Sequence, residues 1–281
     1  MKKFLQATGL IALLAVTFFS TEQTILVVKD MDDIMVELKQ KSKAYEVKPQ
    51  DAIIKEDTIV PGIAGKTVDI NKSYVKMKQY GKFDPNLLIY KQLSPAETLD
   101  HHYKKFIVGG NPTKRMVSLL FRVSEADEIE KIRHILREKQ VAATFFIDGN
   151  WLEQHVELLE PLIAEGHTIG NFSYHRNYKD SSFVWIDTII KRIGKQQQSY
   201  CYAEKKEQAV IDVCHLYQDM TIVPTMVLKD QPLTELKKQL KAGSLISLPI
   251  SDQVEQELPS MIQYIESRGY QLTNLGTHLK E

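Results

Sequence analysis

The sequence predicts an α/β protein whose main part is a parallel sheet curled into a distorted, slightly open barrel of seven strand–helix units. In residues 113–281, short apolar runs alternate with segments of helical periodicity, which is typical of parallel strands joined by crossover helices. Seven such runs follow one another at a pitch that suits a compact barrel. The preceding residues, 23–112, are lysine-rich and irregular and predict a small α+β region.

The predicted strands occupy the most apolar stretches of residues 113–281. In chain order they are residues 116–121, 142–147, 166–171, 199–202, 220–227, 243–250 and 270–272. The predicted helices are residues 126–139, 152–164, 183–193, 205–217, 233–240 and 258–267. The first of these helices places Ile129, Ile132 and Leu136 on one face, which is the spacing of an amphipathic helix.

The composition is that of an ordinary globular protein, with 43% hydrophobic and 26% charged residues. It excludes a disordered chain, a collagen and a polytopic membrane protein. Lys and Arg number 36 and Asp and Glu also number 36, so the formal net charge is zero. Such a chain lacks the excess of positive charge that is typical of nucleic-acid-binding proteins, and we expect no nucleic-acid partner.

Residues 1–22 predict a secretory signal or an uncleaved signal anchor. Lys2 and Lys3 precede the almost uninterrupted apolar run of residues 4–19, which is the pattern of a targeting segment. The residues that end this run are bulky where a signal peptidase prefers small side chains, which favours a membrane anchor. A cleaved signal and a buried helix of a cytosolic domain are the alternatives. The expected location outside the cytoplasm depends on this segment.

The region 23–112 carries structural signals but no recognisable chemistry. The spacing of apolar side chains in residues 29–45 predicts a stalk helix, and residues 68–74 predict a strand that leads into a capped helix. Residues 87–90 predict a further strand. The turn cluster at residues 109–112 is the expected boundary to the domain that follows.

Three stretches of residues 113–281 resemble the polysaccharide deacetylase family, carbohydrate esterase family 4, whose domain is also called the NodB-homology domain. Residues 135–171 contain ILREKQVAATFFIDGNW and LIAEGHTIGN, where the family has LKEKGVKATFFVIGxW and EGHEIGNH. Residues 243–248 and 258–272 match two later family strings in order and spacing. The resemblance implies the family's distorted (β/α)7 barrel and suggests a bacterial envelope protein.

The resemblance also implies a chemistry that can be checked residue by residue. Members of the family hydrolyse the acetamide of an N-acetylated sugar with a bound cation, usually zinc, held by one Asp and two His. A second Asp takes a proton from the attacking water, and a His near the last strand protonates the leaving amine.

This sequence departs from the family at each of those positions. The family string TFDDG reads LFRVS here, so Arg122 replaces the base and Val123 replaces the metal-binding aspartate. The string NHTxxH reads NFSYHR, so Phe172 and Arg176 replace the two histidines. Pro249 replaces the acid histidine.

These replacements predict a pseudoenzyme with no catalytic residue, no metal and no cofactor. Phe and Val offer no lone pair to a cation, and a guanidinium stays protonated and cannot coordinate one. Without a metal, water keeps a pKa far above 7 and is a poor nucleophile. A displaced site is the alternative, because His175 lies one residue before a family histidine position.

Arg122, Arg176 and His175 are the candidate ligand-binding residues. If the loops keep the family's geometry, two guanidiniums lie where the cation belonged and could hold a carboxylate or a phosphate. The alternative is that both are neutralised or extend into water. The acids that could neutralise them are Glu125, Asp127 and Asp187. Glu125, Asp127 and Glu128 are otherwise predicted to cap the following helix and to form its first turn.

The two cysteines are too few for a disulfide framework. Cys201 lies in a predicted strand and Cys214 in the predicted helix that follows it. A bridge forms if strand and helix pack closely, whereas two buried thiols are the other possibility.

The sequence therefore predicts an extracytoplasmic protein, anchored to the membrane or secreted, that binds cell-wall glycan or an envelope protein rather than hydrolysing a substrate. An active carbohydrate N-deacetylase that uses His175 and carboxylates at the barrel mouth is one alternative. An envelope scaffold acting through residues 46–112 is another.

Overall fold

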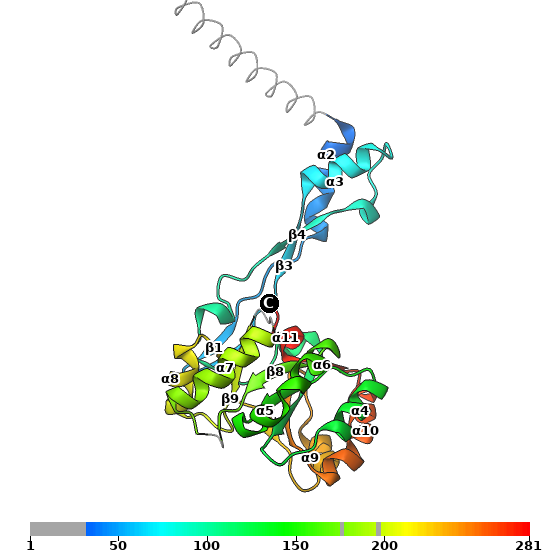
Figure 1. The fold of residues 1–281 in the computed structure, drawn as a ribbon. Coiled ribbons are helices and arrows are strands. Elements are labelled where there is room, and N and C mark those ends of the chain that lie inside the picture. Colours follow the sequence, from blue (N-terminus) through cyan, green and yellow to red (C-terminus); the bar gives the residue numbers. More distant parts are fainter. Residues whose placement is uncertain (1–31, 175–176, 195–197) are drawn as a thin grey trace, which may run out of the picture. The chain divides into compact units, whose positions relative to one another are not determined.

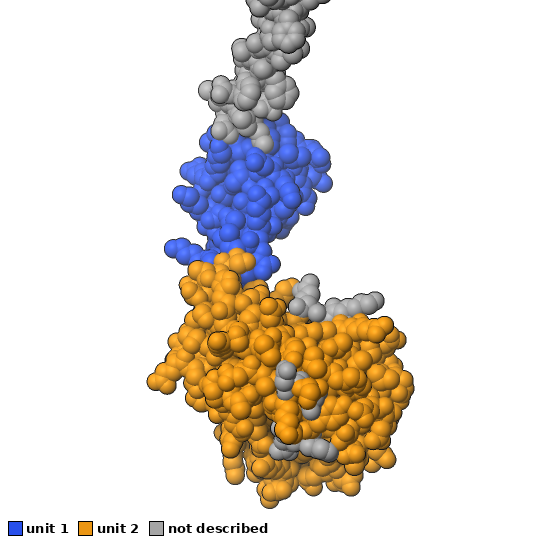
Figure 2. Space-filling view, turned by 60° about the vertical axis from the view of Figure 1, so that its left-hand side comes forward, with its two compact units in different colours: residues 1–49, 64–93 blue, residues 50–63, 94–281 orange. Residues whose placement is uncertain are grey.

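The computed structural model describes residues 32–174, 177–194 and 198–281 (Figure 1). They form two compact units, shown in blue and orange in Figure 2. The first contains residues up to 49 and residues 64–93, and the second contains residues 50–63 and 94–281. The second unit thus includes segments that precede the predicted boundary at residue 113. Residues 46–112, the predicted scaffold module, are divided between the units.

The predicted signal or anchor, residues 1–22, lies outside the described residues. None of the helices that the described residues form is both long and apolar enough to cross a membrane.

The first unit packs two helices beside a two-stranded antiparallel sheet. Its elements are α2 (Asp33–Lys41), η1 (Ser42–Tyr45), β3 (Gly65–Val68), α3 (Ile70–Lys78), η2 (Pro85–Leu87) and β4 (Tyr90–Leu93). The side chain of Asp69 accepts a hydrogen bond from the Lys72 amide at 3.1 Å and caps α3, as expected for a residue that starts a helix. The strand predicted at residues 87–90 begins at Tyr90 instead, because Pro85 opens a 3₁₀ turn before it.

The second unit contains one large sheet. Its strands are β1 (Ile53–Lys55), β2 (Thr58–Val60), β5 (Phe106–Ile107), β6 (Met116–Val123), β7 (Thr144–Ile147), β8 (Thr168–Asn171), β9 (Tyr200–Tyr202), β10 (Met220–Ile222), β11 (Met226–Val227), β12 (Leu245–Pro249) and β13 (Gln271–Leu272). The order is β1-β2-β5-β10-β9-β8-β7-β6-β12-β11, with β13 added to the start of β6. Apart from the antiparallel pair β1–β2, all pairs are parallel.

The sheet is an open half-barrel rather than the predicted barrel of seven units. In the described part of the chain, its end strands β1 and β11 are not paired with each other. The strand predicted at residues 220–227 is two strands, β10 and β11, because Pro224 lacks an amide hydrogen for the ladder. β10 lies between β5 and β9, whereas β11 is the far edge beside β12. The short connection from Ile222 to Met226 spans at most about 14 Å, so the sheet curls strongly.

The helices of the second unit follow the strands as the alternation predicts. They are α4 (Glu130–Glu138), α5 (Gly149–His155), η5 (Val156–Leu158), α6 (Leu159–Ala164), α7 (Asp180–Gly194), α8 (Gln208–Leu216), α9 (Pro232–Gln239), α10 (Asp252–Ser267) and α11 (Leu275–His278). The helix predicted at residues 258–267 is only the second part of α10, which begins after Ser251. Pro259 lies inside this helix, whose first turn is instead capped by the Ser251 side chain.

Side chains of the strands alternate between two apolar layers. Phe121, Val123 and Phe145 belong to a core shared with the covering helices. Leu120, Phe146 and Phe172 belong to a second cluster on the inner face of the half-barrel. Because successive side chains of a strand point to opposite faces, neighbouring residues at the end of β6 have different surroundings.

Two buried histidines have structural partners. His167 accepts a hydrogen bond at Nδ1 from the Ala143 amide at 3.0 Å, and His278 Nδ1 lies 2.8 Å from the Ser118 hydroxyl. Burial lowers the pKa of each histidine to about 4. Both side chains are therefore neutral in the folded protein near pH 7.

We expect these histidines to destabilise the protein in acid. A histidine in the unfolded chain has a pKa near 6.5. Above that pH the two buried histidines contribute fully to the free energy of unfolding, and this contribution is lost as the pH falls towards 4. At pH 4 the loss is about 3 kcal/mol for each histidine. Urea unfolding of wild type and His278→Gln at pH 7.5, 5 and 4 measures the effect.

The variant should lose less stability between pH 7.5 and 4 than the wild type does. His134→Gln is the control, because His134 is exposed on α4 and should leave the pH dependence unchanged. Wild type and variant must be compared because Asp219 has the opposite effect on the pH dependence of stability. Burial raises the pKa of Asp219, so its contribution decreases as the pH rises. Equal pH dependence in wild type and His278→Gln would contradict the prediction.

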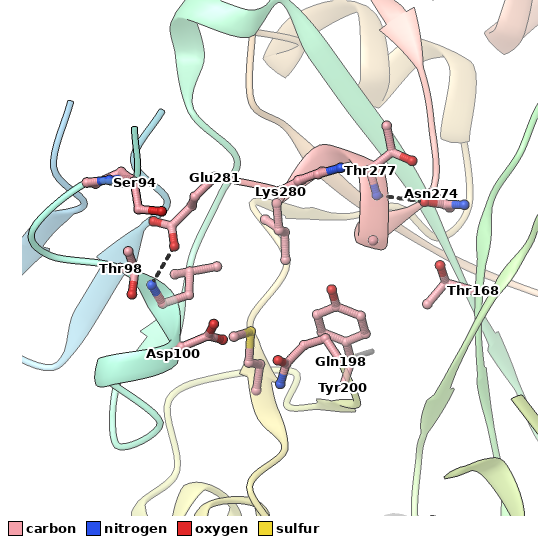
Figure 3. A pocket seen from close by; sticks show the side chains of 15 residues that line it. Ser94, Thr98, Asp100, Thr168, Gln198, Tyr200, Asn274, Thr277, Lys280 and Glu281 are labelled. Atoms are coloured by element: carbon pink, nitrogen blue, oxygen red, sulfur yellow. Dashed lines mark hydrogen bonds between the residues drawn. The ribbon is translucent and has the colours of Figure 1, made fainter. Parts of the chain in front are cut away.

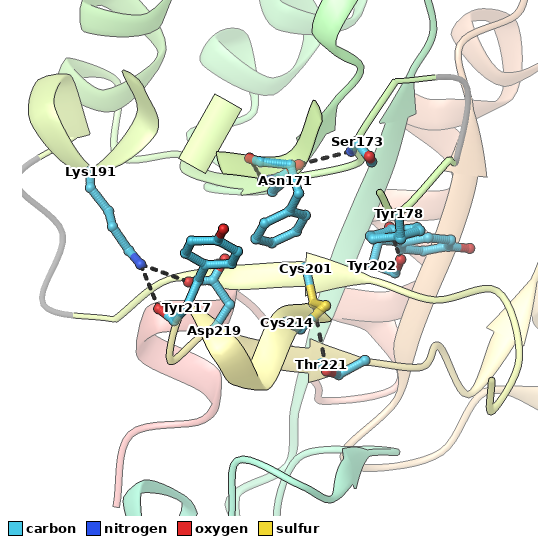
Figure 4. The surroundings of a disulfide bond; sticks show 11 residues. Asn171, Ser173, Tyr178, Lys191, Cys201, Tyr202, Cys214, Tyr217, Asp219 and Thr221 are labelled. Carbon is cyan, nitrogen blue, oxygen red and sulfur yellow. Dashed lines mark hydrogen bonds and ion pairs between the residues drawn. A yellow bond between two sulfur atoms is a disulfide. The ribbon is translucent and has the colours of Figure 1, made fainter. Parts of the chain in front are cut away.

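Cys201 and Cys214 form a disulfide that joins β9 to α8 (Figure 4). Both residues are completely buried, in a cluster with Phe183, Ala203 and Val210. Of the two possibilities that the sequence left open, the structure has the bridge, because α8 packs closely against the strand from which the chain has just come.

Removing this disulfide should lower the free energy of unfolding by about 3 kcal/mol. The bridge restricts the unfolded chain and so lowers its conformational entropy, which stabilises the folded state by about this amount for a loop of this length. Denaturant unfolding of the Cys201→Ser/Cys214→Ser variant, compared with wild type with and without reductant, measures the change. Reductant should not affect the variant, and two reactive thiols in denatured, unreduced wild type would contradict the bridge.

Candidate functional site

The carboxyl ends of β6, β7, β8, β9 and β12 lie at one edge of the half-barrel, which we call the mouth. Loops at this end carry the chemistry in barrels of parallel strands. The described positions of the mouth that matter here are Arg122, Val123, Asp148, Phe172, Tyr202 and Pro249. Arg122 is in register with Phe146 of β7 and Pro249 of β12, so these three side chains share the inner face.

Arg122 is a nearly buried cation without an ion pair. Its exposed fraction is 8%, and its Nε is buried without a hydrogen-bond partner. Among the residues that the structure describes, no carboxylate lies within ion-pairing distance of its guanidinium. The two terminal nitrogens are not among the fully buried unpartnered atoms, so an anion at the mouth could reach them and form charge-assisted hydrogen bonds.

The acids expected to neutralise Arg122 have other partners. Asp127 accepts a hydrogen bond from the Ser124 amide at 2.6 Å, Glu125 accepts one from Asn150 at 3.3 Å, and Asp187 pairs with Lys191 at 3.0 Å. Burial raises the pKa of Asp127, opposed by the Ser124 amide and by the charge of Arg122. Arg122 and Asp127 therefore influence each other without forming an ion pair.

The predicted role of the mouth acids as a helix cap and first turn is wrong. Helix α4 begins only at Glu130, with Ile129 before it. Asp127 instead closes a turn with Ser124, and its carbonyl accepts a hydrogen bond from Trp151 Nε1 at 2.9 Å. The residues that were predicted to start the helix therefore form this turn and the segment that follows it.

Val123 lies in the core between the sheet and the helices. It is completely buried and belongs to the same cluster as Phe121, Phe145 and Ile147. Strand β6 continues through this residue, which keeps the side chain on the outer layer. The aliphatic group has no atom to offer a metal or a substrate.

Phe172 forms part of an aromatic cavity at the mouth. Its ring contacts Tyr202 edge to face, with ring centroids 5.2 Å apart. The Tyr202 hydroxyl lies 2.8 Å from that of Ser247, and the Tyr178 hydroxyl donates to the Tyr202 carbonyl. Phe172, Tyr178 and Tyr202 line a cavity of about 610 Å³, together with Glu204, Lys205 and Glu207, whereas Arg122 is not among its lining residues. A cavity of this size with aromatic walls and a few polar groups suits a small organic ligand.

The remaining predicted site residues divide into two groups. His175 and Arg176 lie outside the described residues, so the two-guanidinium arrangement and the displaced site stay predictions. Pro249 is partly buried and ends β12 beside Arg122. It brings no titratable group to the mouth.

The described mouth residues do not fit a divalent cation. Among residues 32–174, 177–194 and 198–281, no three His, Cys, Asp or Glu side chains are grouped so that they could hold a metal. The donor chemistry agrees, since Val123 and Phe172 have no lone pairs and Arg122 repels a cation. Asp148, which remains at the mouth, accepts a hydrogen bond from the Asn150 amide at 2.9 Å and caps α5.

The aromatic walls of the mouth cavity were not predicted from the sequence. Tyr178 precedes α7 and Tyr202 ends β9, so they meet only because the half-barrel brings these segments together. The signal that could have found Tyr202 is the alternation Tyr200-Cys201-Tyr202 in a strand, which places both rings on one face.

Comparison with known proteins is consistent with this architecture. The family model for polysaccharide deacetylase matches residues 109–213. The uncharacterised protein YlxY of Bacillus subtilis is 34% identical over 272 residues, which cover 89% of this chain and 85% of YlxY. The peptidoglycan-N-acetylmuramic acid deacetylase PdaA of the same organism is 29% identical over 119 residues, covering 39% of this chain and 44% of PdaA.

A solved structure shares the fold over most of the chain. Wild-type BA3943 from Bacillus anthracis, described as a pseudoenzyme of carbohydrate esterase family 4, superposes with a TM-score of 0.67 at 25% identity. The superposition covers 89% of this chain and 96% of BA3943.

Proposed function

Because this chain belongs to the polysaccharide deacetylase family, carbohydrate esterase family 4, we propose that it is a catalytically inactive member that binds an acidic cell-wall glycan at its mouth. The activity that defines the family needs a metal, a base and an acid, and the residues Arg122, Val123, Phe172 and Pro249 supply none of them.

The state of Arg122 is the observation that carries the proposal. The residue is 8% exposed, its guanidinium has no ion pair with a described residue, and it lies near the end of β6 on the inner face. A guanidinium can hold a carboxylate through two parallel hydrogen bonds. The replacement of an anionic residue by a cation at this position inverts the charge of the ligand that the mouth favours.

The aromatic cavity and the relatives support a glycan as the carrier of that carboxylate. Tyr178 is partly exposed at the cavity and presents a ring surface against which the apolar face of a sugar can pack, backed by the buried rings of Phe172 and Tyr202. PdaA is named for its action on N-acetylmuramic acid in peptidoglycan, and this sugar bears a lactyl carboxylate. The ligand that best fits both features is a peptidoglycan strand with free muramic acid carboxylates.

The disulfide supports a location outside the cytoplasm. Bridges such as Cys201–Cys214 form and persist in oxidising compartments and are rare where thiols are kept reduced. The signal or anchor predicted at residues 1–22 leads to the same location, and a cell-wall ligand would be found there.

Binding of the disaccharide N-acetylglucosaminyl-N-acetylmuramic acid tests the proposal. In calorimetric titrations we expect Arg122→Ala to weaken binding about tenfold or more, the worth of a charge-assisted hydrogen bond. Arg122→Lys should retain part of the affinity, because it keeps the charge but loses the planar fork. Adding Arg176→Ala to Arg122→Ala measures the share of the second arginine.

Two controls separate this site from general charge attraction. Arg192→Ala removes an exposed cation on α7 and should leave affinity unchanged. Methyl esterification of the ligand's carboxylate should weaken binding to wild type as much as Arg122→Ala does. Equal affinity of wild type and Arg122→Ala for the acidic disaccharide would reject the proposal.

A further inference from the structure

A second cavity of about 610 Å³ lies at the amino end of the sheet (Figure 3). Its wall includes Thr168, Tyr200 and Met220, which are the first residues of β8, β9 and β10. The mouth with Arg122 and Phe172 is at the carboxyl ends of the parallel strands, so the two cavities lie at opposite ends of the strands of the same sheet. Nothing in the chemistry of the family accounts for this one.

Two hydroxyl groups that face this cavity, on otherwise buried residues, have no hydrogen-bond partner among the described residues. Tyr200 is 4% exposed and Thr168 is 6% exposed, and neither hydroxyl makes a hydrogen bond within the described part of the chain. Figure 3 shows the Tyr200 hydroxyl pointing into the cavity, with Thr168 on the far side of it. Neither oxygen is among the fully buried polar atoms, so each is reached from the cavity and can exchange a hydrogen bond with water for one with a ligand.

Two residues of the rim, Glu281 and Asn274, are held by hydrogen bonds of their own. The carboxylate of Glu281 accepts from the Gly62 amide at 2.6 Å and from the Leu99 amide at 2.8 Å. Asn274 donates to the Gly166 carbonyl at 2.6 Å and accepts from the Thr277 amide at 2.9 Å. The cavity is therefore formed before any ligand arrives, which lowers the entropic cost of binding.

The groups left for a ligand are of mixed character. Gln198 can both donate and accept, Asp100 can accept, and Lys280 can donate. Burial, with a smaller effect of the Asp100 charge, raises the pKa of Tyr200, so its hydroxyl stays a donor at neutral pH. Met220, Leu99 and Leu279 give the cavity an apolar floor. The acids Asp100 and Glu281 outnumber the single cation Lys280 and disfavour an anion.

We propose that this cavity is a binding site for a neutral saccharide. Sugar hydroxyls both donate and accept, which matches the mixture of hydroxyl, amide and carboxylate groups. A sugar ring also has apolar C–H faces that can lie on the Met220 and Leu279 side chains. The volume is within the range of small-ligand sites, about 300–1,000 Å³, and admits one or two sugar rings. The site does not depend on the function proposed for the mouth.

Calorimetric titration of the whole protein with glucose, N-acetylglucosamine, cellobiose and di-N-acetylchitobiose tests the proposal. We expect saturable binding of at least one of these neutral sugars. Tyr200→Phe removes only the hydroxyl and should weaken that binding about fivefold, and Thr168→Val about threefold, as expected for one hydrogen bond each. Glucose 6-phosphate should bind more weakly than glucose.

The controls locate the binding at this cavity. Tyr80→Phe changes an exposed tyrosine of the first unit and should have no effect. Arg122→Ala changes the mouth and should also leave neutral-sugar binding intact, which distinguishes this proposal from the acidic-glycan site. Absence of saturable binding by all four sugars, or unchanged affinity in both Tyr200→Phe and Thr168→Val, would overturn the proposal and leave a cavity filled by water. A preference for glucose 6-phosphate over glucose would overturn its neutral character.

Discussion

Purified protein supplied with zinc should release acetate from N-acetylated glycan no faster than the glycan does in buffer. Zinc lowers the pKa of bound water from about 15.7 to about 7, so its loss lowers the hydroxide available at neutral pH by about 10⁸-fold. Neither Val123 nor Phe172 can hold the metal, and Arg122 cannot serve as a base because it stays protonated. Peptidoglycan and chitooligosaccharide are the substrates to use, with acetate measured enzymatically.

PdaA from Bacillus subtilis, assayed in parallel on peptidoglycan, shows that the assay detects a deacetylase. The same experiment tests the alternative of a displaced site at His175. Chelator-sensitive acetate release by the wild-type protein, abolished in His175→Ala, would contradict the pseudoenzyme and establish that alternative. Stoichiometric zinc in the purified protein would point the same way.

The substitution Val123→Asp, which restores a family residue, should destabilise the protein by about 3–5 kcal/mol. Val123 is completely buried among Phe121, Phe145 and Ile147, and burying an unpaired carboxylate is among the most costly single changes. The new carboxylate would point into the outer core rather than to the mouth. Urea unfolding at pH 7 measures the loss.

Val156→Asp is the matched control, because the same change is made at an exposed valine of η5. We expect it to change stability by no more than about 0.5 kcal/mol. Zinc should not recover the stability of Val123→Asp. Recovery by zinc, or a loss as small as that of the control, would show that residue 123 can turn to the mouth.

The elements that local sequence specifies were predicted well. The run AATFFI gave β7, and the spacing of Ile129, Ile132 and Leu136 gave most of α4. The elements that depend on distant partners were not. β10 and β11 separate because one pairs with β9 and the other with β12. Residues 53–60 and 106–107 join the large sheet, and no local pattern records that their partners are each other and β10.

The same distinction applies to the candidate sites. That Val123 and Phe172 replace metal ligands follows from side-chain identity, because the absence of lone pairs does not depend on the fold. The surroundings of Arg122 do depend on it, since they are set by which acids the packing brings within a few ångströms of the guanidinium.

By itself, the sequence determined the family and the alternation of strands and helices, and it predicted the loss of the residues that deacetylation requires. The tertiary structure decided that Arg122 is nearly buried with no ion pair to a described residue, and that Cys201 is bridged to Cys214. It also decided that segments around residues 100, 168, 200 and 280 enclose one cavity. These features are contacts between residues far apart in the chain, and no local pattern records which distant side chains will meet once the sheet has curled.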